Sequence, residues 1–352
     1  MEEYKAFRRN LKRKQRFKFA VFQIADQFFG RKKIFKNRTK FYKELFETLP
    51  KHGEGKIMSI ERRVDLSLEE FKNHYVKKGI PVVLEGAAKD WDCVKNWSLD
   101  YFNELHGNDE IVLFDFDIKD KYEMITLSDV IKNIKSGGKK YYRFYPLLAR
   151  HPEHINDFDY KWLKERSNSL LNLEAFQIFM GGKNTKTHLH NANPPNIFVQ
   201  AYGEKHWFLY SHYYSPIIDP SPTENMYREA PNKRGNTPFD PFIPDFDSPY
   251  ELFKYIDGYS AHLKPGDVLW NPPFYWHAVN NTTDSIGVGY RWIQPMYSFK
   301  ISPLFMFLDF CSFKPPIWKT WSYFKKDINQ LNIDEMKKLN EAKRKMQEQK
   351  NK

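Results

Sequence analysis

The chain has 352 residues, of which 41% are hydrophobic and 17% aromatic, so it can form one large core with terminal extensions and is too aromatic to be disordered throughout. Its formal net charge is +12, but residues 1–60 alone hold 17 Lys and Arg against 6 Asp and Glu. Because the remainder is close to neutral, we expect no nucleic-acid-binding surface on the folded core.

The two cysteines and the hydropathy pattern bear on the compartment. Cys93 and Cys311 are far apart and show no metal-type spacing, which argues against a disulfide framework or a zinc ribbon and fits a reducing compartment. The sequence contains no apolar run of about 18 residues and no signal-peptide pattern. We therefore expect a cytoplasmic protein.

Residues 1–55 are predicted to form a basic helical N-terminal extension. Within it, Phe17, Val21, Ile24 and Phe28 recur at helical spacing beside lysines and arginines. One interpretation is peripheral contact of residues 1–48 with an anionic membrane surface. The other is a helix that docks on its own core or on a second subunit and leaves its charges in solvent.

Residues 56–300 are predicted to form the main domain, which follows a linker at residues 50–55. Ser67 with Glu70 three residues later predicts a helix start, and this helix should end near residue 78. Short strands bounded by turn residues are then predicted at 82–84, 111–116, 141–145, 176–180, 197–201, 206–210, 268–271 and 286–292. This spacing favours a β-sandwich or barrel.

Residues 301–352 are predicted to be an aromatic and helical C-terminal extension, with a charged helix near residues 334–349. A segment with so many aromatic side chains requires a surface to pack against. Two roles are open to it: packing across the barrel, or forming a homodimer interface.

Three histidines form the candidate metal site. His188 and His190 flank Leu189, so both would project from one face of an extended segment. Far downstream, residues 265–270 read as a turn into a strand, and His277 follows at the start of the next strand. Antiparallel pairing could bring the three imidazoles together in a mononuclear site suited to Fe(II), Zn, Cu or Ni. The alternative is that they are ordinary hydrogen-bonded histidines.

Two segments carry a more specific resemblance. Thr187, His190, Asn196 and Lys205, together with the segment 265–277 that begins Pro-Gly-Asp-Val-Leu and ends at His277, resemble the cupin-like or JmjC 2-oxoglutarate oxygenases. That group includes the asparaginyl hydroxylase that inhibits hypoxia-inducible factor. A looser similarity extends over residues 60–292. The resemblance implies a mainly β fold with flanking helices, namely a double-stranded β-helix, or jelly roll.

The resemblance also implies a ligand set. His190 and His277 would bind Fe(II) and form the catalytic centre. The co-substrate 2-oxoglutarate would be contacted by Thr187, Asn196 and Lys205, with Tyr142 as a further contact by its position in the family. Arg291 departs from the family pattern, which often has a small polar group on this strand, and two roles are open to it: binding a carboxylate of the co-substrate, or a structural ion pair. A lysine suits one carboxylate of that co-substrate, while hydroxyl and amide groups fix its orientation.

The sequence departs from the family pattern at Ala192, where the family places a carboxylate ligand two residues after the first histidine. Three explanations stay open: His188 is recruited as a third ligand; the position is left to a halide or water, as in 2-oxoglutarate halogenases; or metal binds weakly or not at all. Three acids in the insert between the motifs could also approach the site: Asp219, Asp240 and Asp245.

The resulting prediction is an Fe(II)/2-oxoglutarate-dependent oxygenase, a hydroxylase of a protein or small-molecule substrate. The alternatives are a catalytically inert cupin-like scaffold and a 2-oxoglutarate-dependent halogenase. The insert at residues 211–261, rich in Pro, Asp, Asn and aromatic residues, is the predicted specificity element.

Overall fold

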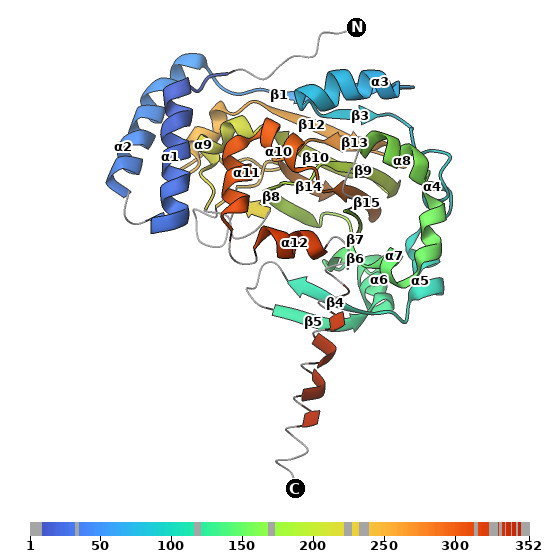
Figure 1. The fold of residues 1–352 in the computed structure, drawn as a ribbon. Helices are drawn as coiled ribbons and strands as arrows, with labels where there is room; N and C mark the ends of the chain where they lie inside the picture. The colour runs from blue at the N-terminus through green and yellow to red at the C-terminus, as the bar shows by residue number, and fades with distance from the viewer. Residues whose placement is uncertain are drawn as a thin grey trace.

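The computed structural model describes residues 9–31, 35–115, 121–167, 173–221, 227–231, 239–312, 316–323, 330, 333–334, 336–338, 340–342 and 344–345. Two large β-sheets face each other at its centre, with helices on both outer sides (Figure 1). This is the jelly-roll architecture that the sequence predicts.

The first sheet has six strands in the spatial order β1 (Ile57–Ser59), β12 (Gly258–Leu263), β10 (Lys205–Tyr210), β14 (Trp276–Asn281), β8 (Lys186–Ala192) and β11 (Tyr227–Glu229). The second has seven, in the order β2 (Arg62–Arg63), β3 (Val82–Leu84), β13 (Val268–Asn271), β9 (Asn196–Tyr202), β15 (Ser285–Trp292), β7 (Glu174–Gly181) and β6 (Tyr141–Tyr145). Pairing is antiparallel except for β1 with β12 and β2 with β3. A separate hairpin joins β4 (Glu110–Asp115) and β5 (Lys121–Thr126).

The core has three layers because the strands of both sheets alternate their side chains between two faces. The interior cluster between the sheets contains Phe198, Trp207 and Val279. A second cluster, which includes Tyr290, lies between the seven-stranded sheet and its helices, and a third, which includes Trp276, lies on the outer face of the six-stranded sheet. On the paired strands of these two sheets, the residues that alternate with members of the outer clusters therefore line the barrel interior.

The helices flank these sheets. They are α1 (Arg13–Phe29), α2 (Phe35–Thr48), α3 (Leu68–Glu70), α4 (Asp92–Asn96), α5 (Leu99–His106), α6 (Leu127–Lys135), α7 (Leu147–Arg150), α8 (Tyr160–Ser167), α9 (Ser215–Ile218), α10 (Pro295–Ile301), α11 (Pro303–Phe310) and α12 (Ile317–Tyr323). The predicted N-cap is confirmed, since the Ser67 hydroxyl accepts a hydrogen bond from the backbone N–H of Glu70 at 3.2 Å. Helical turns continue from α3 through residue 78, which is the predicted end.

Helices α1 and α2 are fastened to the barrel. Leu11, Phe19 and Phe41 are buried in the outer cluster of the six-stranded sheet. The buried Arg38 guanidinium bridges Asp26 of α1 and Asp219, which follows α9. The docked-helix interpretation of this segment thus holds for its buried face, and a membrane contact can involve only its exposed face.

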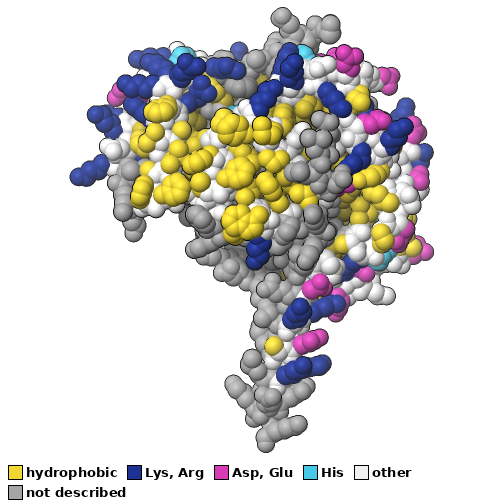
Figure 2. Space-filling model, in the orientation of Figure 1, with side chains coloured by type: hydrophobic (Ala, Val, Ile, Leu, Met, Phe, Trp, Pro, Cys, Tyr) yellow, Lys and Arg dark blue, Asp and Glu magenta, His cyan; other side chains and the backbone are white. Residues whose placement is uncertain are grey.

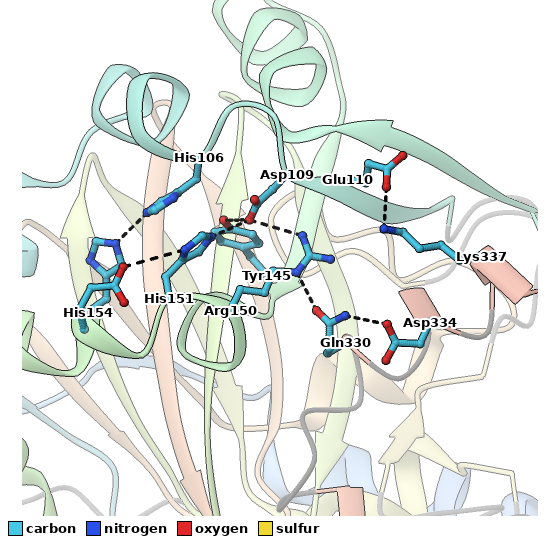
Figure 3. Close-up of polar contacts among 11 residues, drawn as sticks. His106, Asp109, Glu110, Tyr145, Arg150, His151, His154, Gln330, Asp334 and Lys337 are labelled. Carbon is cyan, nitrogen blue, oxygen red and sulfur yellow. Dashed lines mark hydrogen bonds and ion pairs between the residues drawn. The ribbon is translucent and has the colours of Figure 1, made fainter.

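A polar cluster holds the C-terminal segment on the opposite side of the molecule (Figure 3). Arg150 donates a hydrogen bond to Gln330 at 2.6 Å, and Lys337 pairs with Glu110 at 2.6 Å. Asp109 receives the Tyr145 hydroxyl at 2.5 Å and lies 3.0 Å from the His151 imidazole. Described residues between 333 and 345 are helical, and the rest of the predicted charged helix lies outside the described residues.

Candidate functional site

The interior face of the barrel is identified by strand alternation. On β15, Val288 and Tyr290 belong to the outer cluster, so Gly287, Gly289 and Arg291 face the interior. The same alternation applied to β8, β9, β10 and β14 places most of the predicted site residues on this interior face.

Two of the three predicted metal-ligand histidines meet there. His277 of β14 lies directly opposite His190 of β8, and directly opposed residues of neighbouring strands project to the same face. Their ring centroids are 4.1 Å apart. Trp207 of β10 stacks on His277 with 5.5 Å between ring centroids and 17° between the ring planes, which fixes the orientation of that imidazole.

Each imidazole of this pair uses one nitrogen to hold its orientation. Nδ1 of His190 lies 2.8 Å from the carbonyl oxygen of His188, and Nδ1 of His277 lies 2.9 Å from that of Tyr275. Because a carbonyl oxygen only accepts hydrogen bonds, both Nδ1 atoms must carry the proton. The lone pair is then on Nε2 of each ring, which is the arrangement that second-shell carbonyls impose on metal-binding histidines.

Burial keeps both rings neutral. Desolvation, with a smaller contribution from His277, lowers the pKa of His190 well below its ordinary value. Desolvation also lowers the pKa of His277 to about 3. Neutral imidazole is the form that coordinates a metal ion, so no proton has to leave either ring at neutral pH.

His188 is not brought to this pair. In the β8–β14 register, Thr187 faces Val279 and His190 faces His277, so β8 contains one extra residue between these points. His188 lies within this bulge and is exposed. Within the described ranges, no three His, Cys, Asp or Glu side chains are grouped so that they could hold a metal ion.

Lys205 forms the centre of a cationic pocket beside the histidines. Its side chain is fully buried, and Nζ donates to the Asn281 amide oxygen and, at 2.9 Å, to the Ser285 hydroxyl. Desolvation, followed by repulsion from Arg143, lowers the pKa of Lys205 to about 7. No carboxylate pairs with it among the described residues, so the pocket is electrostatically suited to an anion from outside the chain.

Asn196 and Arg291 extend the pocket toward the histidines. Both amide atoms of Asn196 and Nε of Arg291 are buried and have no hydrogen-bond partner in the described part of the chain. Room for them comes from Gly289, where a Cβ atom would lie 3.0 Å from Oδ1 of Asn196 and 3.7 Å from Nε of Arg291. Buried polar atoms without a hydrogen-bond partner favour a polar ligand at this position.

The structure does not bring Tyr142 to the pocket, in contrast to the prediction. Tyr142 is buried in the outer cluster of the seven-stranded sheet, so its neighbours Tyr141 and Arg143 face the interior instead. The Tyr141 hydroxyl is 3.5 Å from the Thr187 hydroxyl, and its ring lies 5.6 Å from Nζ of Lys205. Sequence reasoning missed these two residues because Tyr142 was named by its position in the family, and the sequence does not show which residues of β6 face the interior.

The three acids proposed from the insert are all engaged elsewhere. Asp219 pairs with Arg31 and Arg38 beside α1 and α2. Asp240 pairs with Lys186 at 2.6 Å, and Asp245 accepts a hydrogen bond from the backbone N–H of residue 247. None of them joins the histidine pair.

Comparison with known proteins gives the same picture. A family model described as a cupin-like domain matches residues 68–297. The chain is 27% identical over 249 residues to lysine-specific demethylase 8 of Xenopus tropicalis, which covers 64% of this chain and 51% of that protein. It is 28% identical over 250 residues to JmjC domain-containing protein D of Dictyostelium discoideum, covering 63% and 53% of the two chains.

A third relative, the bifunctional arginine demethylase and lysyl-hydroxylase psr-1 of Caenorhabditis briggsae, is 21% identical over 256 residues, covering 65% of this chain and 61% of that protein. The chain spans about half the length of the first two relatives. The family match covers every residue of the histidine pair and the cationic pocket, and the chain therefore belongs to the cupin-like domain family.

Proposed function

We propose that this protein is an Fe(II)- and 2-oxoglutarate-dependent oxygenase that hydroxylates its substrate. Support comes from family membership, from relatives named as demethylases and hydroxylases, and from two buried histidines whose Nε2 atoms face the barrel interior. The finer resemblance to the asparaginyl hydroxylase group stays a prediction.

The strongest support is the position of Lys205. This lysine is fully buried, has no carboxylate partner among the described residues, and lies in the same barrel interior as the histidine pair. A dicarboxylate fits this arrangement. One carboxylate can pair with Lys205 and the Thr187 hydroxyl, while the other end lies toward Asn196 and the metal position. An apolar or cationic ligand would leave the lysine uncompensated.

The residues have separate tasks in this proposal. His190 and His277 would hold the iron through Nε2, and Lys205, Thr187 and Asn196 would orient the co-substrate. When bound, iron and 2-oxoglutarate supply the activation of dioxygen for C–H oxidation. Trp207 packs against His277 in the interior and helps to exclude water from the site.

The test is co-substrate turnover. The protein, supplied with Fe(II), 2-oxoglutarate and oxygen, should convert 2-oxoglutarate to succinate and carbon dioxide, as measured by proton NMR. Lys205→Met should abolish this turnover, whereas Asp240→Asn, which breaks an ion pair outside the pocket, should retain it. Absence of turnover together with absence of iron binding would establish the inert cupin-like scaffold instead.

A second candidate, halogenation, is favoured by Ala192. This residue is buried, two positions from His190 on the same strand, and its methyl group cannot ligate a metal. If a halide occupies the vacant position, chloride should appear in the product, and Ala192→Asp should convert the protein to hydroxylation. Chlorination that persists in Ala192→Asp would refute this candidate.

A further inference from the structure

The strand β11 lies beside the candidate metal site at the edge of the six-stranded sheet. It pairs with β8 so that Tyr227 faces Ala192 and Glu229 faces His190. Directly opposed residues of an antiparallel pair project from the same face, with Cβ atoms about 5 Å apart. The register therefore places a carboxylic acid next to the first histidine, on the strand neighbouring the one where the family carboxylate is missing.

The side chains of β11 support this placement. Arg228, between the two residues, is buried on the outer face, where it pairs with Asp309 and lies against the Phe305 ring at 4.4 Å. Tyr227 and Glu229 consequently share the opposite face. The Tyr227 ring lies 5.0 Å from the His190 ring, and the Tyr227 hydroxyl is 3.5 Å from Oε1 of Glu229.

We infer that Glu229 supplies the carboxylate ligand that Ala192 lacks, completing a site of two histidines and one carboxylate from three different strands. The inference rests on the proposed function. Glu229 is exposed at the sheet edge and forms no ion pair with another described residue, so the required movement is a rotation of a flexible side chain toward His190. Carboxylate oxygen together with two imidazoles suits Fe(II).

The experiment is a titration of the full chain with Co(II) under exclusion of oxygen, with the visible absorption of the bound ion as the readout. The wild type should bind one equivalent. Glu229→Gln should weaken binding by about tenfold or more, since it removes a charged ligand with little change of shape. The matched control is Asp240→Asn, which removes an acid close in sequence and should bind as the wild type does.

A rescue variant separates ligation from folding effects. Ala192→Asp combined with Glu229→Gln restores a carboxylate at the usual family position, and it should recover the affinity and the absorption of bound Co(II). Equal affinity of the wild type and Glu229→Gln would overturn the assignment of Glu229 and leave the proposed function standing. A wild type that binds neither Co(II) nor Fe(II) would overturn the proposed function itself.

A separate observation concerns the outer surface. Four helices, α1, α10, α11 and α12, together form a broad apolar face (Figure 2). Their large hydrophobic side chains are between 43% and 82% exposed, and they are Phe17, Val21, Phe28, Phe29, Met296, Phe299, Phe307, Phe310 and Trp318. The peptide carbonyl of Cys311 accepts a hydrogen bond from Gln27 of α1, which holds the N- and C-terminal parts of the face together.

The exposed charges on these helices have one sign. Their two acidic residues, Asp26 and Asp309, are buried in ion pairs with arginines. The exposed charged residues on the same helices are all cationic: Arg13, Lys14, Arg16, Lys300 and Lys319. Dark blue side chains border the yellow face along its upper edge in Figure 2.

We propose that this four-helix face docks on an anionic phospholipid surface. Exposed aromatic side chains on helices whose exposed charges are all cationic match a membrane interface that carries negative headgroups. A two-fold contact with a second copy would bring the same cationic border onto itself, without an acidic residue of these helices to compensate it. In the described chain, no helix is both long and apolar enough to cross a bilayer.

The test is co-sedimentation with vesicles of phosphatidylcholine, with and without phosphatidylserine. The protein should pellet with the phosphatidylserine vesicles and be released by salt. Phe29→Ser combined with Phe307→Ser should lose this binding, whereas Ile243→Ser, which removes an exposed residue outside the four helices, should keep it. Vesicle binding that is unchanged by the double substitution would overturn the proposal. A dimer in solution that the same double substitution dissociates would also overturn it.

Discussion

Replacing Lys205 with methionine should stabilise the protein without ligand while removing its affinity for 2-oxoglutarate. Burial lowers the pKa of Lys205 from 10.5 to about 7, and this corresponds to an unfavourable term of about 5 kcal/mol at about 1.4 kcal/mol per pKa unit. The variant loses hydrogen bonds to Asn281 and Ser285, at about 1 kcal/mol each. The net gain is about 3 kcal/mol at pH 6, or roughly 4 °C in Tm for a chain of 352 residues.

The pH dependence of this gain has a definite sign. The folded-state pKa of Lys205 lies below the unfolded value, so the unfolded chain binds more protons between pH 7 and 10.5. Wild-type stability therefore rises through that window, and the advantage of the variant should shrink by about 1.4 kcal/mol per pH unit above pH 7. Chemical denaturation at pH 6 and pH 9 measures both quantities. A variant that is less stable than the wild type at pH 6 would refute this reasoning.

Three further perturbations test the packing and charge of the fold. Gly287→Ala places a Cβ atom 2.3 Å from the Phe198 ring, so it should lower the free energy of unfolding by about 1–3 kcal/mol in urea denaturation. Arg38→Met leaves the buried carboxylate of Asp26 without its ion-pair partner and Asp219 with Arg31 alone, so it should lower Tm through a loss of about 3–5 kcal/mol; an unchanged Tm would contradict a buried ion pair. Burial lowers the pKa of His206 and of His212 to about 4. Between pH 6.5 and pH 4 the unfolded chain therefore binds more protons than the folded protein, and the free energy of unfolding should decline as the pH falls. Urea denaturation at several pH values should show this as falling midpoints.

Much of the fold could be predicted from the sequence, because alternation and turn residues identify strands locally. The predicted strands at 141–145 and 268–271 coincide with β6 and β13, and the Ser67 cap begins its helix as expected. Pairing between distant strands was only a possibility from the residue pattern, and the resemblance singled out His190 and His277 as the pair. The residues of β11 gave no periodic signal, since the strand has three residues within a long insert.

The errors at the site have local causes. A regular extended strand would put His188 and His190 on one face, but a bulge in β8 separates them, and single-sequence alternation cannot reveal an extra residue that depends on the partner strand. The sequence likewise does not show which residues of β6 face the interior, because Tyr141, Tyr142 and Tyr145 are chemically alike. Glu229 was overlooked because its relation to His190 exists only in the sheet register.

The most direct test of the account is an anaerobic titration of the protein with Fe(II) and then 2-oxoglutarate, followed through the visible charge-transfer absorption of iron chelated by the co-substrate. We predict a band at one equivalent of each. It should be absent in His190→Ala and His277→Ala, and also in Lys205→Met at the 2-oxoglutarate concentration that gives the full band in the wild type. No band and no stoichiometric iron in the wild type would contradict the proposed oxygenase and identify an inert cupin-like scaffold.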